Sequence, residues 1–183
     1  MPDLTPEAKK IVQDTWAPVA ANTKHFGVLL FLKYFKEYSW CRYFKQYPRV
    51  PVVDTSRSTP LSQLYFKEYP RIQGYFTHFK GKSLEELKDS AKLRAHGTTV
   101  LHAVTAMVEN LDDPDTMVVL LNNTAERHTP RSVTFPEYED LFKCIADFLA
   151  EQLGDKFDDK AKAAWGIVLD TMATVIKAQL DKQ

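Results

Sequence analysis

The chain has 183 residues, of which 44% are hydrophobic and 26% charged, and its formal net charge is zero. This length and balance predict one globular domain with a full hydrophobic core. The neutral charge gives no support for nucleic acid or a membrane surface as a partner, and the longest apolar run, Phe26 to Leu32, is too short to span a bilayer.

We expect the protein to be cytoplasmic. The first residues lack the basic segment and apolar segment of a secretory signal, and Pro2 excludes N-myristoylation. The two cysteines, Cys41 and Cys144, form neither a CxxC pair nor a metal-binding signature. Reduced thiols are therefore expected.

The first predicted helix starts at Thr5-Pro6-Glu7, where Thr caps, Pro fits the first turn and Glu complements the helix dipole. Pro18 should end this helix because it has no N–H to donate. The next apolar run, Phe26 to Phe35, fits a buried helix and a strand equally well by periodicity alone.

A short sequence repeat follows that run. Tyr34-Phe35-Lys36-Glu37-Tyr38 recurs unchanged at residues 65–69, and the residues between the two copies include a loop-like stretch from Pro48 to Pro60. Two copies are too few to build a solenoid.

Helix-start signals mark the rest of the chain. Ser83 with Glu86 has the capping-box form, Asp113-Pro114 caps a second helix, and Phe135-Pro136-Glu137 opens a third. Gly154 suits the end of that third helix, and a last helix should follow Asp158. The apolar faces of these last two helices are large enough to form most of the core.

Two histidines stand out between residues 92 and 128. His96 lies in an apolar stripe at helical spacing, and His128 ends a second short helical pattern just before Thr129-Pro130. Two such helices could place two imidazoles on opposite sides of one flat ligand. The alternative is that both are core histidines bonded to the backbone.

The chain resembles the globin family, in particular the cytoglobin and neuroglobin type. The resemblance rests on Leu93-Arg94-Ala95-His96 with Val100, on residues 108–115, and on His128 with Val133. It implies an all-α fold, the three-on-three helical sandwich around a haem, in a single domain over residues 1–183. It also decides for a helix at Phe26 to Phe35. Because removing residues 39–69 would restore a continuous globin-like passage, we interpret them as an inserted or duplicated segment.

The resemblance also implies a site. His128 would be the proximal ligand of haem b, iron protoporphyrin IX, and His96 a second, displaceable ligand that makes the iron hexacoordinate. The residues implied to contact the porphyrin are Phe31, Phe76, Phe79, Val100, Val133 and Leu141, while Tyr138 and Ile145 line the slot. Phe44 is an alternative to Phe76, and ordinary core packing is an alternative for every apolar contact.

The polar contacts of the porphyrin are less well specified. Arg131 and His78 are implied as partners of the propionates, with exposed surface positions as the alternative. The basic residue that the family often has three positions after the distal histidine is Thr99 here. Thr23 and Thr98 replace the bridging cysteines of vertebrate cytoglobins, so that disulfide is not expected.

Three functions are compatible with these observations. The first is reversible binding of O2, and of CO and NO, for storage, supply or sensing, by a monomer or homodimer. The second is NO dioxygenation or nitrite reduction with an external reductase. The third is a helical interaction module without a cofactor.

Overall fold

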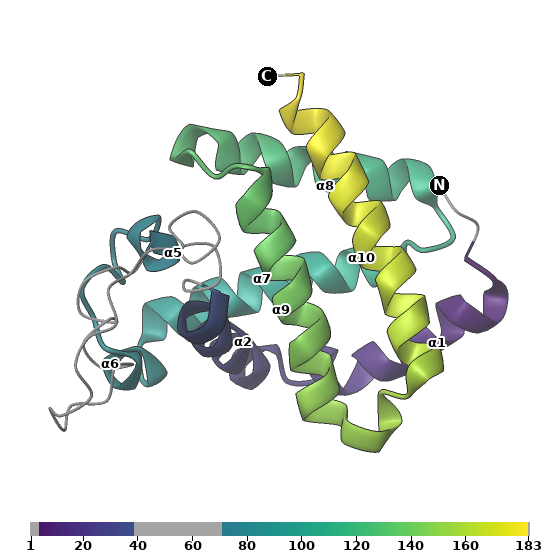
Figure 1. The fold of residues 1–183 in the computed structure, drawn as a ribbon, viewed down its shortest axis with the longest axis horizontal. Coiled ribbons are helices and arrows are strands. Elements are labelled where there is room, and N and C mark those ends of the chain that lie inside the picture. The colour runs from purple at the N-terminus through teal and green to yellow at the C-terminus, as the bar shows by residue number, and fades with distance from the viewer. Residues whose placement is uncertain (1–3, 39–70, 183) are drawn as a thin grey trace, which may run out of the picture.

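The computed structural model describes residues 4–38 and 71–182, and within these ranges all regular structure is helical. The predicted all-α fold is thus confirmed. The helices are α1 (Pro6–Ala20), α2 (Thr23–Lys33), α5 (Arg71–Gly74), α6 (Leu84–Lys88), α7 (Ala91–Glu109), α8 (Pro114–His128), α9 (Phe135–Leu153) and α10 (Asp159–Leu180), with a π-turn η1 (Tyr34–Tyr38) and 3-10 turns η2 (Thr129–Arg131) and η3 (Gly154–Lys156). In Figure 1, α9 and α10 run side by side and α7 crosses them. None of the described helices combines the length and apolar character needed to cross a bilayer.

The predicted helix starts are confirmed by their hydrogen bonds. Thr5 Oγ1 accepts from the amide of Ala8, and Asp113 and Asp158 cap α8 and α10 in the same way. Ser83 and Glu86 form the complete capping box. Gly154, at φ 53°, ends α9 in a conformation that favours glycine. Local hydrogen bonds therefore mark where these helices begin.

The prediction that Pro18 ends the first helix is wrong. Helix α1 continues through Pro18 to Ala20. Pro18 lies in the last turn and is exposed, so its ring faces solvent and only one backbone hydrogen bond is lost. Val19, the next residue, is fully buried and holds this last turn against the core.

Helix α2 confirms that the apolar run is helical, and the last two residues of the run, Tyr34 and Phe35, belong to the π-turn η1. This turn, η1, coincides with the first copy of the repeat; the second copy and the proposed insertion at 39–69 lie outside the described residues.

Lys33, with 8% of its side chain exposed, forms ion pairs with Glu37 of η1 at 2.6 Å and Glu151 of α9 at 2.5 Å. Burial lowers its pKa, but hydrogen bonds to the two carboxylates outweigh this and raise it to about 12. The charged lysine therefore ties η1 to α9.

Helices α2 and α7 cross at two glycines with almost no space between their backbones. A Cβ built on Gly27 would lie 2.5 Å from the carbonyl carbon of Gly97, and one built on Gly97 would lie 2.5 Å from the backbone of Gly27. Neither position can hold a larger residue unless a helix moves. Gly97 follows His96, and Gly27 lies one helical turn before Phe31. The crossing therefore also fixes the position of the backbone that carries these two side chains.

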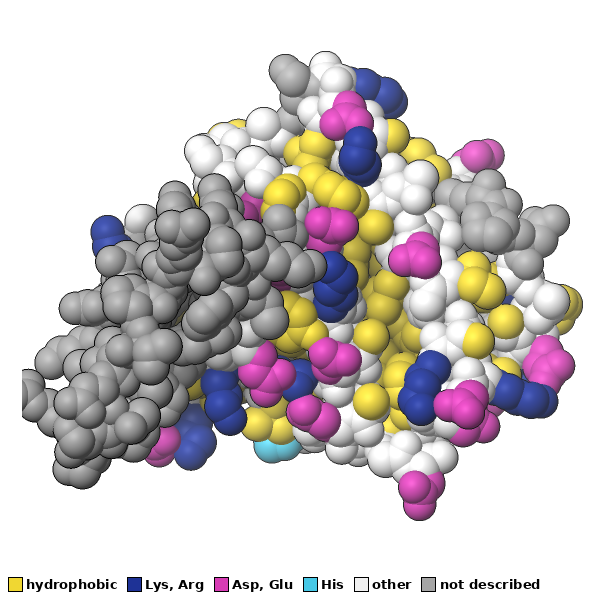
Figure 2. Space-filling model, in the orientation of Figure 1, with side chains coloured by type: hydrophobic (Ala, Val, Ile, Leu, Met, Phe, Trp, Pro, Cys, Tyr) yellow, Lys and Arg dark blue, Asp and Glu magenta, His cyan; other side chains and the backbone are white. Residues whose placement is uncertain are grey.

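On the face shown in Figure 2, acidic and basic side chains are interspersed. Hydrophobic side chains on this face follow the seam between α9 and α10. In the core, Trp165 of α10 packs on Trp16 of α1, with ring centroids 5.5 Å apart. Their indole N–H groups donate to Thr15 and Thr105 respectively, which satisfies both buried donors.

Candidate functional site

His96 lies in a cluster of aromatic side chains drawn from three parts of the chain. The centroid of its ring is 4.8 Å from that of Phe31 on α2 and 4.9 Å from that of Phe76, which follows α5. Both contacts are edge-on, and Phe79 stacks on Phe76 at 5.4 Å. The structure thus brings together four of the residues that the sequence indicated.

The surroundings of His96 keep its imidazole neutral. Burial, followed by the electrostatic influence of His128 and Arg131, lowers its pKa to about 4. At neutral pH the ring therefore has one N–H to donate and one nitrogen lone pair.

His128 is the last residue of α8, and its ring is held in one tautomer. Its Nδ1 lies 2.8 Å from the backbone carbonyl oxygen of Thr124, one turn earlier. Since a carbonyl can only accept, Nδ1 carries the proton and Nε2 keeps its lone pair when the ring is neutral. The ring of Tyr138, on α9, packs edge-on against His128 at 5.8 Å, and its hydroxyl donates to the same carbonyl at 3.4 Å.

The other indicated residues fall into two groups. Val100, Val133 and Leu141 are partly buried and pack against the hydrophobic core. Arg131 and His78 are exposed, and each has a protein partner: Arg131 donates to the carbonyl of Arg127, and His78 Nδ1 accepts from Lys92 Nζ at 3.1 Å. Their contact with propionates remains a prediction, and Phe44 lies outside the described residues.

These residues fit a haem. The porphyrin supplies four ligands to its iron, so the protein has to add only one or two imidazole nitrogens and apolar walls. His128 offers an Nε2 lone pair whose ring orientation is already fixed by Thr124. His96 is neutral, as a second nitrogen ligand must be, and it lies among aromatic rings that suit a flat apolar group.

Sequence reasoning missed part of the cluster. Tyr34 and Phe35 also contact Phe31, at 6.1 and 5.7 Å, and Phe35 contacts Phe76 at 5.6 Å. The repeat singled out both residues but not their position in space. Thr124 could have been found, because a residue four positions before a helical histidine presents its carbonyl to that side chain.

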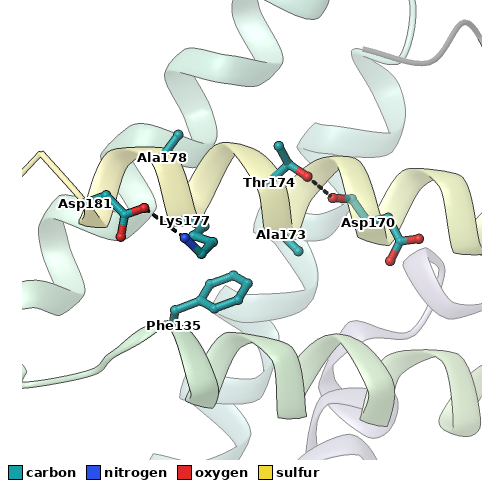
Figure 3. Close-up of a pocket in the computed structure, with 7 residues that line it drawn as sticks. All are labelled: Phe135, Asp170, Ala173, Thr174, Lys177, Ala178 and Asp181. Atoms are coloured by element: carbon teal, nitrogen blue, oxygen red, sulfur yellow. Dashed lines mark hydrogen bonds and ion pairs between the residues drawn. The ribbon is translucent and has the colours of Figure 1, made fainter.

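A separate groove lies between the start of α9 and α10 (Figure 3), with a volume of about 420 Å³. The ring of Phe135 points across it toward α10, where Lys177 pairs with Asp181 at 3.0 Å. The full lining is Phe135, Asp170, Ala173, Thr174, Lys177, Ala178 and Asp181. It contains neither histidine, so the groove is distinct from the site described above.

Comparison with known proteins gives consistent matches. The family model described as Globin matches residues 59–176. A globin of Nerita albicilla is 38% identical over 176 residues, which cover 96% of this chain and 92% of the relative. Cytoglobin-1 of Danio rerio is 28% identical over 84% of this chain and 70% of its own length. A globin of Tritia mutabilis is 27% identical over 92% of this chain and 96% of its own length.

Proposed function

Because the chain belongs to the globin family, whose members bind gases at a haem, we propose that it holds haem b between His128 and His96 and binds O2 reversibly. The observation that supports this most directly is the pair of imidazoles with available lone pairs. One is fixed by the carbonyl of Thr124 and the other lies between two phenylalanine rings.

His128 acts as the permanent ligand. A bound haem would supply an iron centre at which O2, CO or NO can bind. His128 would hold that iron through Nε2, and its Nδ1–H bond to Thr124 fixes the ring and increases the donor strength of Nε2. Because the carbonyl belongs to the same helix, ring and backbone stay aligned.

His96 acts as the exchangeable ligand. Its low pKa leaves the lone pair free to bind the iron in the absence of a gas. With O2 bound in its place, the same ring would be able to donate its N–H to the ligand as a hydrogen bond. The rings of Phe31 and Phe76 limit the positions to which the imidazole can move.

The remaining residues set the walls and the mouth of the site. Val100, Val133 and Leu141 provide apolar contact for the porphyrin, and Phe76 with Phe79 provides an aromatic surface beside it. Arg131 and His78 are exposed, where they can pair with the propionates. We propose that the protein stores, supplies or senses O2 in the cytoplasm.

An absorption spectrum tests this function. Apoprotein mixed with haem should show a Soret band, and addition of CO to the reduced protein should shift that band. Protein that stays colourless after mixing with haem would exclude the proposal and favour a helical interaction module.

Replacing His96 with leucine should convert six-coordinate, low-spin iron to five-coordinate iron in the reduced, gas-free protein. The substitution should also raise the apparent affinity for CO, because the gas no longer competes with an internal ligand. Visible spectra and CO titration measure both effects. His102→Leu is the matched control, since His102 lies on the same helix, is exposed, and contacts Thr23. A wild-type spectrum that is already five-coordinate and unchanged by His96→Leu would refute the role of His96.

A further inference from the structure

A line of aromatic rings runs from His96 to Tyr38. The ring of Phe31 lies 4.8 Å from His96, that of Tyr34 lies 6.1 Å from Phe31, and that of Tyr38 lies 6.1 Å from Tyr34. Each centroid distance is within the range of aromatic contact. Phe31, Tyr34 and Tyr38 are all buried. An electron can therefore pass between the haem site and Tyr38 by short steps through packed rings.

Tyr38 also has a partner that can take its proton. Its hydroxyl donates to the carboxylate of Asp147 on α9, and Asp147 is exposed to solvent. Burial, with a contribution from this hydrogen bond and from the charges of Asp147, Cys144 and Glu37, raises the pKa of Tyr38 far above its ordinary value. The phenol thus keeps its proton at neutral pH.

We propose that Tyr38 is a one-electron donor to the haem site when hydrogen peroxide has oxidised it, with Asp147 as the proton acceptor. This inference rests on the proposed haem function. Hydrogen peroxide is the oxidant: it takes two electrons from the haem site and two protons from the solvent and leaves as two water molecules. Tyr38 returns one of these electrons through the rings of Tyr34 and Phe31, and the haem site keeps the second oxidising equivalent. Its O–H bond breaks, the proton moves to the Asp147 carboxylate, and a neutral phenoxyl radical and a carboxylic acid remain.

Tyr138 is the natural competitor for this role. It touches His128 directly, at 5.8 Å, and is therefore separated from the haem site by a single ring contact. Its hydroxyl, however, donates to the backbone carbonyl of Thr124 at 3.4 Å, and a carbonyl is too weak a base to accept the proton. Proximity to the haem site favours Tyr138 as the electron donor, whereas proton transfer favours Tyr38. The variants Tyr38→Phe and Tyr138→Phe therefore show which of the two properties decides where the radical forms.

Freeze-quench electron paramagnetic resonance of the haem-loaded protein tests the proposal. After mixing with one equivalent of hydrogen peroxide, the wild type should show a tyrosyl radical whose hyperfine structure collapses when ring-deuterated tyrosine is incorporated. Tyr38→Phe should lose this signal and Tyr138→Phe should retain it. Asp147→Asn should also reduce it strongly, because the amide oxygen can accept the hydrogen bond but cannot take the proton.

The possible failures are distinguishable. A signal that persists in Tyr38→Phe, or that disappears only in Tyr138→Phe, overturns the role of Tyr38 while the Soret band still supports haem binding. A protein that takes up no haem overturns both proposals. If Tyr38→Phe does not fold, Asp147→Asn decides the question, because Asp147 is exposed and its replacement leaves the core intact. An unchanged radical in that variant contradicts the inference.

Discussion

Replacing His128 with alanine should abolish stable haem binding. His128 is the only permanent ligand that we propose, and the hydrogen bond from its Nδ1 to Thr124 fixes its Nε2 for the iron. Without it, the Soret band should be lost or should disappear on gel filtration. The free energy of unfolding should also no longer increase when haem is added. For a ligand present at 1,000 times its Kd, that increase is about 4 kcal/mol.

Two controls make the His128 result specific. His102→Ala removes an exposed histidine that contacts Thr23, and it should leave the Soret band unchanged. His128→Gly with added imidazole should recover a Soret band, because the free imidazole replaces the missing side chain. Haem binding by His128→Ala at wild-type strength would show that another group is the ligand.

Replacing Gly97 with alanine should destabilise the protein strongly. The new Cβ would lie 2.5 Å from the carbonyl carbon of Gly27, and this contact is with backbone rather than with a flexible side chain. Overpacking of this kind costs about 1–3 kcal/mol. Because His96 precedes Gly97, the displacement of α7 should also weaken haem retention. Urea unfolding of the apoprotein measures the first effect, and transfer of haem to an acceptor protein measures the second.

Gly166→Ala is the matched control for that experiment. Gly166 also lies within a helix, α10, but a Cβ at this position meets no atom within 4 Å. Alanine forms helix better than glycine by about 1 kcal/mol, so this variant should be more stable than the wild type. The same chemical change should therefore have opposite signs at the two sites. Equal effects would refute a packing role for Gly97.

The parts of the fold that follow from local chemistry were predictable. Thr5, Ser83, Asp113 and Asp158 start helices through hydrogen bonds to residues three positions later, and this information is contained in the sequence itself. The prediction that Pro18 ends the first helix is wrong because the effect of a proline on a helix depends on its place in the last turn and on its exposure. Neither property can be read from the proline alone.

The site required information of another kind. Periodicity placed His96 and His128 on helices, but only the resemblance to globins assigned them to a common ligand. Nothing in the pattern around Gly27 and Gly97 indicated that the two helices touch there, because that contact joins distant parts of the chain. The position of Tyr34 beside Phe31 was hidden for the same reason, although the repeat had singled out Tyr34.

The glycine crossing has a consequence for the speed of gas binding. With α2 and α7 in backbone contact beside His96, the segment that bears this residue cannot move closer to α2. In the function that we propose, the exchange of His96 depends on rotation about its side-chain bonds, past the edges of Phe31 and Phe76. Trimming either phenylalanine ring should then accelerate the association of CO without altering the chemistry at the iron.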